Sequence, residues 1–327
     1  MHMKFGAIAA LLAGLTVAVF VVLHIGIAPV LDAVARVGWG GFALIVLCGL
    51  GVAGILATAL FALLSDHAPW LAFLAARQLR DSASDVLPFT QIGGIAIGAR
   101  AIILGGVPAP FAFAGAMVDV TTELIAQVAF VALGLMLGVA KLRANAELAP
   151  YANGLILGTA LLVPAMIALV VLQRRGSSLA EKLAGRFLPA AVSHTEAFSQ
   201  ALNGLYGNPW RVALSATIHL SAWIASGVWV WVVLRLIGMH IDVFSAVVIE
   251  SLLAALRSAT VFIPSAIGVQ EAGYAALAPV FGMGPEVGFA VSLLRRARDI
   301  VVGVPVLLIW QAVEGRRAFA QQNGESP

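Results

Sequence analysis

This chain of 327 residues has few charged residues, a single cysteine and a small net charge. Charged residues make up only 11% of the sequence, against about 25% in a typical soluble domain, so the chain lacks the polar residues to cover itself in water. Cys48 is the single cysteine, which excludes a disulfide framework and a metal site built from thiolates. The formal net charge of +3 is too small to indicate a nucleic-acid partner.

The motifs of several enzyme classes are also missing. The sequence contains no Walker loop, no Gly-x-Ser-x-Gly nucleophile elbow and no HExxH zinc motif. The six histidines lack the spacing of metal ligands, and His219, inside an apolar run, is interpreted as a packed polar residue rather than a proton carrier. We therefore expect no catalytic residue, no metal and no cofactor, and we predict that the protein is not an enzyme.

Apolar sequence is abundant instead, at 61% of the chain. Runs of about 20 apolar residues, long enough to cross a bilayer core of about 30 Å, recur from end to end. We expect one all-α polytopic domain over residues 1–327 in the bacterial inner membrane, with an uncleaved first span. Six full spans are predicted, at residues 5–24, 41–64, 108–138, 151–172, 210–238 and 286–311.

Two further apolar stretches, 71–105 and 243–282, are interrupted near their middle. The interrupting residues are Pro88, Gly93 and Gly94 in the first stretch, and Pro264 and Gly268 in the second. Proline removes a backbone donor and breaks a helix, and glycine tolerates the unusual backbone that results. Each stretch is predicted to fold as a re-entrant hairpin that returns to its own side of the membrane, with these residues at its tip.

Basic residues predict the orientation in the membrane. The linker 174–209 carries four basic residues in its first 13 positions, and Arg316 and Arg317 follow the last span. The positive-inside rule places the linker and both termini in the cytoplasm. Leucine and phenylalanine recur every four residues over 179–187, which indicates an amphipathic interfacial helix or, alternatively, a solvated linker helix.

Charged residues recur at matching distances from the two prolines. They lie 31 and 35 residues after Pro88 and again 31 and 35 residues after Pro264. The residues at these positions are Asp119 and Glu123 in the first half, and Arg295 and Asp299 in the second. This pattern predicts an inverted repeat with halves at about 41–138 and 210–311, and such repeats with broken helices near the midplane are typical of transporters.

Charged residues inside the apolar stretches are the candidate functional residues. Each costs about 2.5–3.5 kcal/mol at the bilayer centre, so most must pair or face water. They could form a purely structural network, but three arginines within Arg295–Arg298 favour one that also binds a ligand. Guanidinium groups bind phosphate through paired donors, so an anionic headgroup is expected. The predicted substrate-binding residues are Arg80, Asp85, Arg100, Asp119, Glu123, Arg257, Glu271, Arg295, Arg296, Arg298 and Asp299.

Helical geometry predicts partners for some of these charges. Arg295 and Asp299 are four residues apart and can pair along one helix face. Arg296 is turned away from them and needs another carboxylate, for which the candidates are Glu250 and Glu271. We expect Arg295 to lack a carboxylate of its own and to meet the headgroup. Arg80 and Arg257 are expected to occupy equivalent places beside the two hairpin tips, opposite Asp119, Glu123 and the Arg295–Asp299 cluster.

Segments around both hairpins resemble the membrane region of lysylphosphatidylglycerol synthase and flippase proteins. They are Arg77–Pro88, Gly93–Gly94, Gly98–Ala101 and Pro264–Ala272. The likeness covers about residues 5–311 and is greatest to the hopanoid-biosynthesis-associated membrane proteins of that family. It implies an inner-membrane, flippase-like fold with two re-entrant hairpins. Relatives with a separate soluble domain transfer an aminoacyl group to lipid, and we expect this chain to lack that activity.

The leading prediction is a lipid translocator or lipid-handling protein, with anionic or hopanoid lipids as partners. One alternative is an integral membrane enzyme acting on a lipid or polyprenyl phosphate. In that case Asp81 and Asp85, four residues apart, would share a helix face and hold Mg²⁺. Another alternative is a non-transporting partner of lipid-biosynthesis enzymes.

Overall fold

The structure, a computed structural model, describes residues 27–86, 91–144, 192–259 and 268–322 together with a few isolated positions between 153 and 168 and at 266. All regular secondary structure in this part of the chain is helical, as predicted. The predicted span 5–24, most of the span 151–172, the linker up to residue 191, and both Pro88 and Pro264 lie outside the described residues.

Three helices are long and apolar enough to cross a membrane. They lie in α2 (Ile27–Leu64), α5 (Ala109–Ala144) and α8 (Pro209–Leu236). They coincide with the predicted spans 41–64, 108–138 and 210–238, and they make the chain a membrane protein. The predicted span 286–311 lies within α11 (Pro285–Gln322), a helix of 38 residues whose apolar sequence is interrupted by the charges of Arg295–Asp299.

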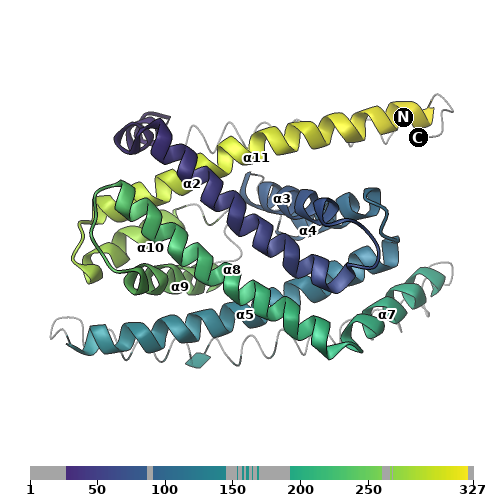
Figure 1. Cartoon of the computed structure of the whole chain (residues 1–327), viewed down its shortest axis with the longest axis horizontal. Coiled ribbons are helices and arrows are strands. Elements are labelled where there is room, and N and C mark those ends of the chain that lie inside the picture. Colours follow the sequence, from purple (N-terminus) through teal and green to yellow (C-terminus); the bar gives the residue numbers. More distant parts are fainter. Residues whose placement is uncertain are drawn as a thin grey trace.

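The first interrupted stretch forms two helices, α3 (Trp70–Val86) and α4 (Gln91–Leu104), which pack side by side (Figure 1). A Cβ atom at Gly94 would lie 2.3 Å from Ser84 Oγ, and one at Gly98 would lie 3.3 Å from the Ala76 carbonyl oxygen. The contact position on α3 falls as that on α4 rises, so the two helices are antiparallel. Gly94 therefore lies in the first turn of α4, where its missing side chain lets the two arms approach closely.

The second interrupted stretch is likewise divided, into α9 (Val243–Ala259) and α10 (Val269–Leu277), followed by the short helix η3 (Ala278–Phe281). Gly268 precedes α10 with a φ of 81°, a conformation that glycine adopts without steric cost. Its backbone N–H donates to Glu271 Oε2 at 2.7 Å. Gly268 is thus the start of the second arm, and Glu271 already satisfies its N–H group.

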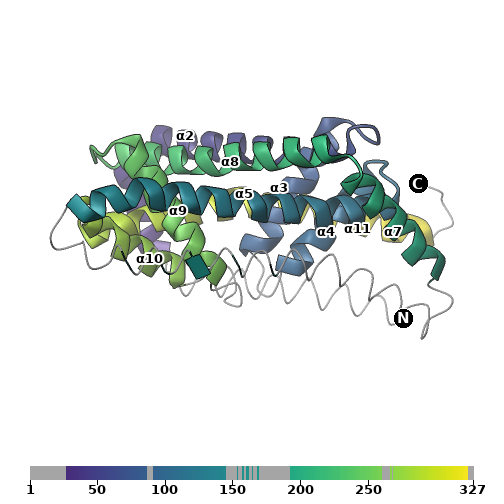
Figure 2. The ribbon, with the colours of Figure 1, turned by 90° about the horizontal axis from the view of Figure 1, so that it is seen from below.

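The long helix after each hairpin packs against the first arm of the other hairpin. α5 packs against α9, and α11 packs against α3. α2 and α8 pack against each other, and they lie side by side along one side of the molecule in Figure 2. α7 (Val192–Tyr206), the last part of the predicted linker, packs against α5 and α8.

Two apolar cores flank the centre of this arrangement. One includes Trp229, Tyr274 and Leu294 from α8, α10 and α11, and the other includes Phe73 and Ile102 from α3 and α4. All five residues have less than 3% of their surface exposed. Each core packs several helices together, so that the charged residues are held by rigid elements.

A close approach of α5 and α9 supplies a test of this packing. A Cβ atom at Gly134 would lie 1.6 Å from Ser251 Oγ, so Gly134→Val is expected to lower the free energy of unfolding by about 1–3 kcal/mol or more. The control Gly51→Ala adds a Cβ to an exposed helical position with nothing within 4 Å, so it should leave stability unchanged or raise it by about 0.5–1 kcal/mol. Unfolding in detergent measures both, and equal stability of the two variants would contradict the α5–α9 contact.

Candidate functional site

A network of ion pairs joins α3 to α5. Arg77 Nε donates to Asp81 Oδ2 at 2.9 Å, and its Nη2 donates to Glu123 Oε1 at 2.9 Å. Arg80 Nη1 donates to Asp119 Oδ2 at 2.8 Å, and its Nη2 donates to Glu123 Oε2 at 2.6 Å. The network forms because residues three or four apart share a helix face. The prediction that Arg80 lies opposite Asp119 and Glu123 is confirmed.

His219 of α8 extends this network from a third helix. Its side chain is fully buried, and its Nε2 lies 2.9 Å from Asp119 Oδ1. The other ring nitrogen, Nδ1, is also buried and has no hydrogen-bond partner among the described residues. His219 is packed, as predicted, but its neighbour is a carboxylate that Arg80 also contacts.

A second network joins α9, α10 and α11. Arg295 Nη2 donates to Glu250 Oε1 at 2.8 Å, and Tyr274 Oη donates to Glu250 Oε2 at 2.7 Å. Arg296 Nε donates to Glu271 Oε1 at 3.1 Å, which confirms one of the two partners expected for Arg296. These pairs tie both arms of the second hairpin to α11.

Two expectations about the arginines of α11 are wrong. Arg298 Nε donates to Asp299 Oδ1 at 2.9 Å, whereas Arg295 pairs with Glu250 and has its guanidinium 4.8 Å from the centre of the Trp229 ring. The rule for residues four apart considers one helix alone, and here α9 supplies a carboxylate from the side. Arg295 therefore has a carboxylate of its own.

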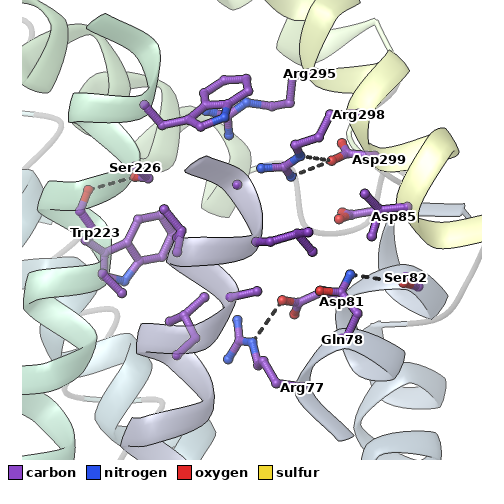
Figure 3. A pocket seen from close by; sticks show the side chains of 18 of the residues that line it. Arg77, Gln78, Asp81, Ser82, Asp85, Trp223, Ser226, Arg295, Arg298 and Asp299 are labelled. Atoms are coloured by element: carbon purple, nitrogen blue, oxygen red, sulfur yellow. Dashed lines mark hydrogen bonds and ion pairs between the residues drawn. The ribbon is translucent and has the colours of Figure 1, made fainter. Parts of the chain in front are cut away.

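A cavity of about 150 Å³ lies between the two networks, enough for several water molecules (Figure 3). Its lining comes from α2, α3, α5, α8, α9 and α11. The α2 wall is apolar, and Trp223 and Trp229 of α8 contribute aromatic rings. The ionisable lining residues are Arg77, Asp81, Asp85, Glu123, Glu250, Arg295, Arg298 and Asp299. Five carboxylates therefore face three guanidinium groups in this lining.

The predicted substrate-binding residues occupy five different settings. Those that line the cavity are Asp85, Glu123, Arg295, Arg298 and Asp299. Arg80 and Asp119 belong to the first network behind the cavity wall, and Arg296 and Glu271 pair with each other. Arg257 on α9 interacts electrostatically with Asp85. Arg100 lies apart, with its Nε 3.2 Å from Glu314 Oε1 in a partly exposed ion pair.

Several lining residues were not predicted to be part of the site. Arg77, Asp81 and Asp85 follow one another at a spacing of four, and all three face the cavity from α3. That spacing is a sequence signal for one helix face, and it could have added Arg77 and Asp81 to the site. Trp223 and Trp229 carry no such signal, because aromatic residues in a span equally indicate packing or an interfacial belt.

Asp85 differs from the other carboxylates of the lining. Among the described residues it makes no hydrogen bond and no ion pair, whereas Asp81, Glu123, Glu250 and Asp299 each accept from an arginine. Within the same part of the chain, no group of three or more His, Cys, Asp or Glu residues is arranged to hold a metal ion. Asp85 is thus the carboxylate of the lining that has no ion pair among the described residues.

A more exposed ion pair, between the first turn of α8 and Asp66 after α2, provides a contrast. Arg211 Nη1 lies 2.7 Å from Asp66 Oδ2, and the side chain of Asp66 is 63% exposed. The hydrogen bond from Arg211 holds the pKa of Asp66 below its ordinary value. Exposed pairs of this kind contribute little to stability because water competes for both partners.

Comparison with known proteins yields one match. A family model described as the lysylphosphatidylglycerol synthase TM region matches residues 6–306. No curated protein and no solved structure matches the chain. The matched region contains both networks and every residue that lines the cavity.

Proposed function

Because the chain belongs to the lysylphosphatidylglycerol synthase transmembrane family, we propose that it moves a polar lipid between the leaflets of the bacterial inner membrane. The charged cavity between the two networks carries this proposal. A headgroup passes through the cavity, and the apolar tail of the lipid stays in the bilayer. The protein acts by binding and moving the lipid and does not change it chemically.

The energetic cost of the lining supports a ligand-binding role. A single charge at the bilayer centre costs about 2.5–3.5 kcal/mol. A carboxylate without an ion pair there destabilises the protein, which indicates that it serves a function such as ligand binding. Most lining charges are offset by ion pairs, but Asp85 lacks one among the described residues. We infer that Asp85 and the water-accessible cavity serve the headgroup.

We further propose that α2–α5 and α8–α11 are the two halves of an inverted repeat. Their helix order supports this, because each half has a long helix, two shorter α-helices and a second long helix, and the second half adds only the short η3. The packing of α5 on α9 and of α11 on α3 supports it too. Rocking of one half against the other would open the cavity to each side in turn. In this arrangement both termini are cytoplasmic. The test is a fusion after Gln322 of a reporter that works only in the periplasm. Activity of this reporter would contradict the arrangement.

The charges of the lining add a requirement to the expected headgroup. An anionic group was expected because three arginines lie close together, but each of them has its own carboxylate. The five carboxylates of the lining also outnumber its three guanidinium groups. We therefore propose a phospholipid or hopanoid whose headgroup offers hydroxyl groups, which can donate to carboxylates and accept from arginines.

A leaflet assay tests the function. Purified protein is reconstituted into liposomes that contain a lipid with a fluorescent tail and a phosphoglycerol headgroup, or a fluorescent hopanoid polyol. A membrane-impermeant quencher is then added outside. We expect quenching to continue beyond the outer leaflet, at least about tenfold faster than in protein-free liposomes. Asp66→Asn, at the exposed ion pair, is the control and should behave as the unchanged protein. Quenching that stops at the outer leaflet for both lipids would refute the proposal.

A further inference from the structure

The first ion-pair network contains unequal numbers of positive and negative side chains. Its cations are Arg77 and Arg80, and its carboxylates are Asp81, Asp119 and Glu123. With two guanidinium groups and three carboxylates, the network carries a formal charge of −1 when His219 is neutral. A proton on His219 brings the formal charge of this network to zero.

We propose that His219 is a proton-binding site, and that its proton is the ion coupled to lipid movement; the second part rests on the function proposed above. Imidazole is the side chain whose ordinary charge change falls between pH 5 and 8. The Nε2–H group donates to Asp119 Oδ1 at 2.9 Å, while Nδ1 has no partner among the described residues. A proton taken from water on one side of the membrane forms the Nδ1–H bond, and that bond breaks when the proton leaves to the other side.

Two carboxylates of α5 lie near His219. Asp119 contacts it, and Glu123 on the same helix interacts with it electrostatically. α2, which packs along α8, has no charged residue between Gly38 and Leu64. The charged residues on the other described stretches packed against α8 are Glu196 on α7, Glu250 and Arg257 on α9, and Glu286, Arg295, Arg296, Arg298, Asp299, Glu314, Arg316 and Arg317 on α11. Glu196 is exposed, and the acidic residues Glu250 and Asp299 are already paired with arginines.

Arg77 connects this proton to the cavity. Its Nη2 lies 2.9 Å from Glu123 Oε1, and its Nη1 lies 3.9 Å from Asp119 Oδ2. When His219 loses its proton, Asp119 loses a neighbouring positive charge and attracts Arg77 more strongly. Glu123, which lines the cavity, is then held less tightly. The charge of His219 thereby changes how tightly Arg77 holds Glu123, and so how freely Glu123 can contact a headgroup in the cavity.

His219→Gln is the variant that separates proton binding from packing. The glutamine amide can still donate to Asp119, but it does not take up a proton in this pH range. His240→Gln is the matched control, because His240 is an exposed residue after α8 whose Nδ1 lies 3.0 Å from the Gly238 carbonyl oxygen. Both variants replace one of the six histidines and leave five for comparison.

The first experiment observes the proton directly. Nitrogen NMR of protein with ¹⁵N-labelled histidine is recorded between pH 5 and 8. We expect one buried imidazole signal to change between the neutral and the imidazolium form, to vanish in His219→Gln and to persist in His240→Gln. A His219 signal that keeps one protonation state throughout, in folded protein, would refute the proton site whether or not the protein moves lipid.

The second experiment observes coupling in the leaflet assay. A gradient of one pH unit corresponds to about a tenfold change in an equilibrium that involves one proton. We expect the gradient to change the distribution of the fluorescent lipid by up to about tenfold in the unchanged protein and in His240→Gln, and to have no effect in His219→Gln. Lipid movement without any response to the gradient would refute the coupling alone. An absence of lipid movement would refute the proposed function and with it the coupling, while the NMR result still decides the proton site.

Discussion

Replacing Arg295 by methionine is expected to lower the free energy of unfolding by about 3–5 kcal/mol. Glu250 is 2% exposed and would remain in the protein interior without the guanidinium that now lies 2.8 Å away. Removing one partner of a buried ion pair has a cost of this size, because the remaining charge is neither paired nor hydrated. Tyr274 would still donate one hydrogen bond to Glu250, but that bond brings no positive charge. Reversible unfolding in mixed micelles measures the loss.

The double variant Arg295→Met with Glu250→Gln shows whether the pair causes the loss. It removes both charges, so most of the lost stability should return, and the two substitutions should be strongly non-additive. Asp66→Asn, which breaks the exposed pair with Arg211, serves as the control and should leave stability nearly unchanged. A double variant as unstable as Arg295→Met would mean that Arg295 stabilises the fold through Trp229 or by its volume.

This expected result differs from the role that the sequence suggests for Arg295. Its position in a group of three arginines indicates a headgroup contact, whereas its buried partner indicates a structural clamp between α9 and α11. Neither of the nearby carboxylates on α11 itself, Asp299 and Glu286, is the partner of Arg295. Glu250 precedes Arg295 by 45 residues, and no local spacing rule connects residues so far apart.

Features that depend on one helix or one local break were predictable. The spans in α2, α5 and α8 follow from apolar length, and the division of each interrupted stretch follows from proline chemistry. The meeting of Arg80 with Asp119 and Glu123 was predicted from the matched offsets of charged residues from the two prolines, and the ion pairs confirm it. The sequence is therefore sufficient to predict a feature whose geometry depends on one helix or one turn.

Features that depend on packing between distant helices were not predictable. His219 is 100 residues from Asp119, and its contact arises because α8 packs against α5. The cavity likewise exists only where six helices meet. A sequence shows which residues are too polar for the membrane, but the choice among several oppositely charged partners is made by helix packing.

Charges of opposite sign stand at the same distance, 31 residues, after Pro88 and after Pro264. Asp119 of α5 pairs with Arg80 of the first hairpin, whereas Arg295 of α11 pairs with Glu250 of the second. Each pair thus ties the first arm of a hairpin to the long helix that follows that hairpin. Glu250 and Arg295 line the cavity, whereas Arg80 and Asp119 lie behind its wall.

Asp85→Asn is expected to slow lipid movement at least about tenfold without lowering the stability of the fold. Asp85 lines the cavity, and among the described residues it has no hydrogen bond or ion pair to lose. Replacing an unpaired carboxylate in the membrane by a neutral amide removes an unfavourable charge, so unfolding should need equal or greater free energy. A tenfold slower rate corresponds to about 1.4 kcal/mol of lost transition-state stabilisation, the scale of one charge-assisted hydrogen bond to a headgroup.

Two matched substitutions make this result specific. Asp81→Asn changes the residue one turn earlier, which pairs with Arg77, and should reduce stability and lipid movement together. Asp66→Asn repeats the same chemical change at an exposed pair and should affect neither. Unfolding in micelles and the leaflet assay measure both quantities on each protein. If Asp85→Asn unfolds more easily, Asp85 has a structural partner; if it moves lipid at the unchanged rate, the headgroup does not use this carboxylate. Only a loss of movement in a fully stable protein assigns Asp85 to the path of the lipid, because such a loss cannot arise from damage to the fold.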